Sequence, residues 1–149
     1  MSALSELLPE LQAWNNGRGI QPLDWLYCEN VPSERVTAMS ELFWPSFVVF
    51  EDYVLRDGFT QKHLRACEGG EGATRSAVEA MVNTLHIDDL FGKENWSPLV
   101  EARAVRLVNV LGQVHRLKLA DEFPERRFKV EVFDGSQPGG DVSLSFWQV

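Results

Sequence analysis

The stretch LFWPSFVVFEDYVL, residues 42–55, decides the fold more than any other part of this 149-residue chain. Pro45 lacks a backbone donor and restricts the residue before it, so a helix that precedes it must end near residue 43. Two runs of aromatic and β-branched residues, 47–50 and 53–55, follow and flank Glu51 and Asp52. This pattern predicts a β-hairpin. Because Glu-Asp is a poor sequence for a two-residue hairpin turn, one continuous bent strand is the alternative.

Helix signals lie on both sides of this hairpin. N-capping residues and apolar residues at helical spacing predict helices over residues 4–14, 33–43, 61–67, 76–85 and 98–119. The last of these is the longest, and it begins with Ser97 as an N-cap and Pro98 at the first helical position. Residues 19–32 show no clear period and are expected to be irregular.

A second hairpin closes the chain. Residues 128–133 and 142–148 alternate between apolar and polar side chains, and a loop containing Pro138, Gly139 and Gly140 separates them. No regular alternation of strands and helices favours a parallel sheet. The sequence therefore predicts a single globular α+β domain over residues 1–149, with an antiparallel sheet of about four strands in two hairpins and helices packed mainly on one face.

The net charge of the chain indicates which class of macromolecule it can bind. The chain carries 22 acidic and 14 basic residues, a formal net charge of −8. Residues 1–57 hold nine acids against three bases, whereas residues 102–149 hold six against seven. An acidic chain is not expected to bind nucleic acid, and its acidic first half favours a protein partner with a basic surface.

The longest apolar run, residues 47–50, is far too short to cross a bilayer, so no membrane contact is expected. Since residues 1–10 lack the pattern of a secretory signal, we expect a cytoplasmic protein.

Catalytic motifs are missing from the sequence. The glycines at residues 69, 70 and 72 lack the lysine and serine of a phosphate loop, and no serine stands in a nucleophile elbow. His63 and Cys67 are spaced to face one metal ion from a helix, but two ligands do not make a site, and no metal or cofactor is expected. The best alternative for chemistry is a small enzyme or a ligand- or metal-binding domain with a pocket near His86, Asp88 and Asp89, where a carboxylate could orient the imidazole.

The sequence favours binding over catalysis. The candidate partner-binding residues are Glu51 and Asp52, an acidic pair at the hairpin tip, and Trp147, which is out of phase with the apolar face of its strand. Together with the acidic first half, they predict a non-enzymatic protein-binding domain. On analogy of size and charge alone, its role would be that of a toxin-neutralising (immunity-like) protein or an adaptor.

Overall fold

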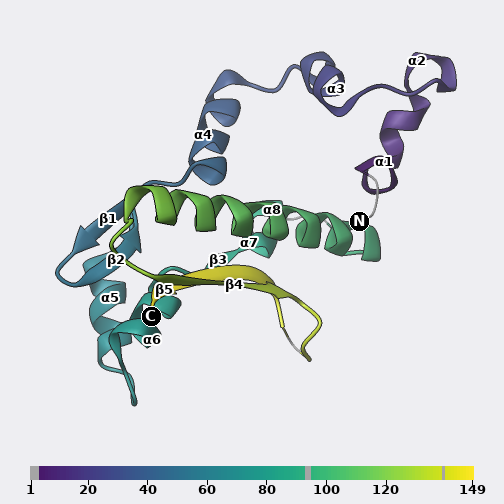
Figure 1. The fold of residues 1–149 in the computed structure, drawn as a ribbon. Coiled ribbons are helices and arrows are strands. Elements are labelled where there is room, and N and C mark those ends of the chain that lie inside the picture. Colours follow the sequence, from purple (N-terminus) through teal and green to yellow (C-terminus); the bar gives the residue numbers. More distant parts are fainter. Residues whose placement is uncertain (1–3, 93–94, 139) are drawn as a thin grey trace. The chain divides into compact units, whose positions relative to one another are not determined.

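A computed structural model describes residues 4–92, 95–138 and 140–149 of the chain, and these residues form α-helices and antiparallel strands (Figure 1). The α+β class predicted from the sequence is confirmed. The chain divides into two compact units, residues 1–40 and 41–149. The organisation of residues 1–149 as a single globular domain stays a prediction. None of the helices in the described ranges is both long and apolar enough to span a membrane.

The first unit consists of short helical pieces. The helix expected over residues 4–14 is broken into α1 (Leu4–Leu7), a 3₁₀ helix (Pro9–Ala13) and α2 (Trp14–Gly17). Pro9 has no N–H to continue the first turn, and Asn15 and Asn16 adopt left-handed backbone with φ of 54° and 56°. These local interruptions explain why leucine periodicity alone overestimated the length of the helix.

Two further helices follow in a segment that was partly expected to be irregular. α3 (Pro22–Glu29) begins with Pro22 at its first position and ends at Asn30, which is left-handed. α4 (Ser33–Phe43) begins in the first unit and ends two residues before Pro45, as predicted. Neither helix has a buried residue. The amphipathic periodicity that normally indicates a helix is weak in α3 because Trp25 lies on the face opposite Leu23, Leu26 and Tyr27.

The hairpin predicted in the opening stretch is confirmed. β1 (Phe47–Phe50) pairs antiparallel with β2 (Tyr53–Arg56), with Val49 opposite Val54. Glu51 has a φ of 53° in the two-residue connection between the strands. Glycine or asparagine would adopt this left-handed conformation more easily. The bent-strand alternative is therefore wrong.

Helices α5 (Gln61–Glu68) and α6 (Arg75–Val82) follow the hairpin, and β3 (Leu85–His86) and α7 (Ile87–Phe91) lead to the long α8 (Pro98–Glu122). Ser97 caps α8 by accepting a hydrogen bond from the Val100 N–H, as the sequence predicts. The N-cap of α6 is Thr74, whose hydroxyl accepts from the Ala77 N–H, and Ser76 instead donates to the Gln148 carbonyl. The helix thus begins earlier than predicted.

The strands form two sheets where the sequence suggested one of about four strands. β4 (Phe128–Asp134) and β5 (Val142–Gln148) pair along their full length, and β3 adds to the other edge of β5 to give the order β3-β5-β4. The β1-β2 hairpin is a separate two-stranded sheet.

The three-stranded sheet is covered by helices on both sides. α8 runs along one side of the sheet, and α6 lies on the other (Figure 1). Val142, Leu144 and Phe146 are buried with apolar residues of α8, while Ser145 donates its hydroxyl hydrogen to the Ala80 carbonyl of α6. β5 is therefore the central strand of the three-stranded sheet, and β4 lies at one edge of it.

Candidate functional site

The most exposed apolar side chains of the first unit lie on α3 and α4. We call them the apolar set, and their exposed fractions are Leu23 60%, Leu26 49%, Tyr27 71%, Val36 54% and Met39 48%. A large apolar side chain is normally buried, and burial stabilises by about 1.5–3 kcal/mol for each such side chain. Five of them are exposed on two successive helices, neither of which has a buried residue, so each of the two helices has an exposed apolar side suited to docking.

The spacing within the apolar set matches the way a helix inserts into a groove. Leu23, Leu26 and Tyr27 follow one another at positions i, i+3 and i+4 of α3. Val36 and Met39 stand at i and i+3 of α4. Side chains at these intervals project from one face of a helix. Each helix can therefore present its apolar side chains to a partner as one row.

Acidic side chains accompany the apolar set. Asp24 and Glu29 belong to α3, and Glu34 lies in the first turn of α4. All three residues are exposed. Arg35 is the one basic residue of α3 and α4, so acidic side chains outnumber basic ones on these two helices, and a complementary surface would be apolar with basic residues near it.

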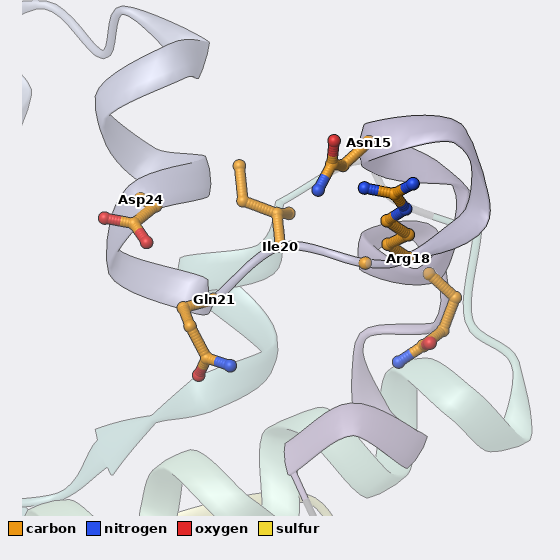
Figure 2. Close-up of a pocket in the computed structure, with 7 residues that line it drawn as sticks. Asn15, Arg18, Ile20, Gln21 and Asp24 are labelled. Atoms are coloured by element: carbon orange, nitrogen blue, oxygen red, sulfur yellow. The ribbon is translucent and has the colours of Figure 1, made fainter.

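A polar recess lies beside α3 within the same unit (Figure 2). Its volume is about 460 Å³, and it is lined by Gln12, Asn15, Arg18, Gly19, Ile20, Gln21 and Asp24. Figure 2 shows Asn15 and Arg18 on one side of the recess and Asp24, on α3, across from them. A site with one guanidinium, one carboxylate and several amides can receive polar groups of either charge, so it suits the polar margin of a docked chain.

The predicted hairpin tip is partly neutralised. Arg65 of α5 forms ion pairs with Glu51 at 2.5 Å and with Glu68 at 2.9 Å. The hydrogen bond from Arg65 lowers the pKa of the Glu51 carboxyl below its ordinary value. The Asp52 side chain is exposed, and its backbone carbonyl accepts a hydrogen bond from Gln148 Nε2. Of the two tip carboxylates, Asp52 is therefore the better placed to attract a basic partner.

Trp147, the third predicted contact residue, lies near the end of β5. It is half-buried, whereas its neighbours Phe146 and Gln148 are buried. The ammonium of Lys129, its partner across the strands, lies 5.1 Å from the centre of the indole ring. The bond between Asp52 and Gln148 brings the hairpin tip close to this end of β5, so the structure draws the predicted residues toward one region.

The predicted pocket residues are arranged differently from the expectation. His86 Nδ1 pairs with an Asp141 carboxylate oxygen, and both side chains are about half exposed. This hydrogen bond lowers the pKa of Asp141. Asp89 is exposed, while Asp88 Oδ1 is buried and has no hydrogen-bond partner within the described part of the chain. The sequence missed Asp141 because 55 residues separate it from His86; only the pairing of His86 with Ser143 across β3 and β5 brings them together.

A pocket at His86 stays a prediction. Asp141 also lines a recess of about 230 Å³ that the loop between β4 and β5 forms. His63 Nε2 lies 3.9 Å from Cys67 Sγ, as helical spacing suggests. No group of three or more histidine, cysteine or acidic side chains that could hold a metal ion occurs in residues 4–92, 95–138 and 140–149.

A buried polar cluster joins the two sheets, and no sequence motif indicates it. One Glu79 oxygen accepts from the Val54 N–H at 2.8 Å, and the other accepts from the Gln148 N–H at 2.6 Å. Asn83 accepts from the Arg56 N–H and donates to the Val54 and Phe146 carbonyls. Glu79 of α6 and Asn83, the residue that follows α6, thereby satisfy backbone groups on the free edge of β2 and on the part of β5 that β3 does not cover; β2 and β5 do not pair with each other.

His115 is a second buried polar residue, and it lies where α8 meets both sheets. Its Nδ1 is 2.7 Å from the Leu111 carbonyl, so this nitrogen carries the proton, and Nε2 accepts from Arg56 Nη2 at 3.4 Å. The rings of Phe47 and Phe146 pack on it. The pKa of His115 is lowered to about 4, mainly by burial, while the Leu111 hydrogen bond acts to raise it and the nearby Arg56 guanidinium lowers it. Its position near the end of α8, among Gln113, Arg116 and Lys118, suggests a solvated or dipole-facing side chain, but His115 is fully buried and its environment is that of a neutral core residue.

Comparisons of the chain with protein-family models, with curated proteins and with solved structures found no match.

Proposed function

We propose that this chain is a non-enzymatic, acidic protein-binding domain and that it docks through the apolar set on α3 and α4. The observation that carries the proposal is the exposure of five large apolar side chains on two helices that bury none of their residues. Leaving such side chains in water sacrifices stabilisation that a partner can restore on binding.

The chemistry of the surface describes the partner. Rows of apolar residues at i, i+3 and i+4 fit an apolar groove, and the excess of acidic over basic side chains on the two helices fits a groove with basic residues near it. The partner is therefore a protein with a groove of this kind. A toxin-neutralising or an adaptor role would each use such a surface.

The proposal is tested with two charge-matched double variants of α4. Val36→Asp with Met39→Asp places two carboxylates in the apolar set, and Thr37→Asp with Ala38→Asp places two carboxylates at exposed positions on another face of the same helix. Wild type and both variants are used as bait in quantitative affinity capture, and the captured protein is then titrated against each by calorimetry. We expect V36D/M39D to bind at least about tenfold more weakly, because loss of a buried anchor costs more than about 1 kcal/mol. T37D/A38D should bind like wild type.

Two results would contradict this surface. One is equal affinity of V36D/M39D and wild type for the partner. The other is a loss of unfolding free energy in V36D/M39D of the size expected for core residues, which would place Val36 and Met39 in an intramolecular contact.

The hairpin tip and Trp147 are a second predicted contact. Because Arg65 already pairs with Glu51, reversal of the Asp52 charge tests the tip with least disturbance of the fold. We expect Asp52→Lys to weaken partner binding by about two- to tenfold through a slower association rate, with little added sensitivity to salt, since a favourable charge is removed. Glu71→Lys, the same charge change in an exposed loop, is the control. Equal association rates for the two variants would remove the tip from the interface.

A further inference from the structure

The outer edge of β4 is a strand edge with no strand beside it in the described part of the chain. The strand order β3-β5-β4 leaves β4 terminal. Phe146, opposite Val130, turns its carbonyl away from β4 toward Asn83, and Val130 turns its carbonyl outward, where it accepts from Arg116 Nη2 at 3.2 Å. In an antiparallel ladder this orientation alternates, so the backbone groups of Phe128, Val130 and Val132 all face outward. They form a template for another strand.

The charges on this edge strand are complementary to themselves. Lys129 and Glu131 alternate with Phe128, Val130 and Val132, so they lie on the face of the sheet opposite α8. Within one chain their charged atoms are 3.5 Å apart. If two copies of β4 pair antiparallel about a twofold axis at Val130, Lys129 of each copy lies directly opposite Glu131 of the other. The pairing therefore forms two identical cross-strand ion pairs.

We propose that β4 is a self-association edge, through which two copies of this chain join their three-stranded sheets in the register centred on Val130. In this register the Val130 residues exchange both backbone hydrogen bonds, and Phe128 of each copy is opposite Val132 of the other. Arg116 does not block the bond, because a carbonyl oxygen has two lone pairs.

One further observation favours a second copy as the occupant. Residues 102–149, which include β4, hold seven bases and six acids, so two copies of this acidic chain would meet through a part of small net charge. The β4 edge belongs to residues 41–149 and the apolar set to residues 1–40, so the failure of one proposal would leave the other unaffected.

Charge exchange tests the register. Sedimentation velocity over a concentration series should show a reversible dimer for wild type and for Lys62→Glu, an exposed control with the same charge change. Lys129→Glu and Glu131→Lys should each weaken the dimer by roughly tenfold or more, because like charges face each other twice. The swapped double variant K129E/E131K should regain the wild-type dimer. A mixture of K129E with E131K should form a heterodimer, because every cross-strand pair is then of opposite charge.

The mixing step separates this proposal from a purely intramolecular role of the Lys129–Glu131 pair, since mixing cannot repair a contact within one chain. Circular dichroism confirms that the variants are folded. A wild-type protein that is monomeric at all concentrations would overturn the proposal. A dimer that persists unchanged in K129E, or a mixture that remains monomeric, would overturn it as well.

Discussion

Glu79→Ala is expected to lower the unfolding free energy of this protein by about 4 kcal/mol, the largest effect of any single substitution considered. The Glu79 carboxylate is fully buried and accepts hydrogen bonds from the Val54 and Gln148 backbone N–H groups and from Gln148 Nε2. Without it, two buried backbone donors on two different sheets lose their acceptor, and each orphaned group costs about 1–3 kcal/mol. Because a domain of this size has about 5–15 kcal/mol in total, this loss would be between about a quarter and four-fifths of its stability.

Urea denaturation followed by tryptophan fluorescence measures this effect. Glu79→Gln is the matched comparison, since it keeps the size and one oxygen of the side chain but turns an NH₂ group toward hydrogen-bond donors. We expect its unfolding free energy to lie between those of wild type and E79A. Glu71→Ala, which removes an exposed carboxylate, should change stability by less than about 0.5 kcal/mol. A loss of less than about 1 kcal/mol in E79A would show that Glu79 does not hold the sheets together.

The second large effect is a dependence of stability on pH that originates at His115. Burial lowers the pKa of His115 to about 4 in the folded state, while the unfolded chain has the ordinary value near 6.5. Between these values the unfolded state binds more protons than the folded state, so stability falls as the pH is lowered from about 6.5 to about 4. The full loss over this window is about 3 kcal/mol, and above pH 6.5 His115 causes no further change.

The pH dependence is measured by denaturation at a series of pH values and by NMR titration of the His115 ring. We expect the ring to stay neutral until the pH is well below 5. His115→Leu should lose most of this dependence between pH 6.5 and 4, whereas the contribution of carboxylates such as Asp141, whose pKa the His86 contact lowers, should remain. A His115 titration midpoint near 6.5 would contradict the buried, neutral assignment.

The sequence predicted those helix ends and strands that are determined by residues close together in the chain. Pro45 ended α4, Ser97 and Pro98 began α8, and alternating side chains marked β4 and β5. Each signal acts through neighbours within a few residues, where backbone sterics and capping decide the structure.

Features that depend on distant residues were not predictable in this way. The two-sheet arrangement depends on Glu79 and Asn83 reaching strands that lie 25 to 69 residues away in the sequence. α3 was missed because Trp25 lies on the face opposite Leu23, Leu26 and Tyr27, so apolar residues occur on both faces and no polar face marks the helical period.

The most direct test of the proposed function is hydrogen–deuterium exchange of the full chain with and without its captured partner. If α3 and α4 dock through the apolar set, their amides should exchange markedly more slowly in the complex, since the helices are then covered and stabilised. The V36D/M39D variant should show no such protection at the same partner concentration. Protection confined to other segments, such as the hairpin tip or β4, with unchanged exchange in α3 and α4, would contradict the account.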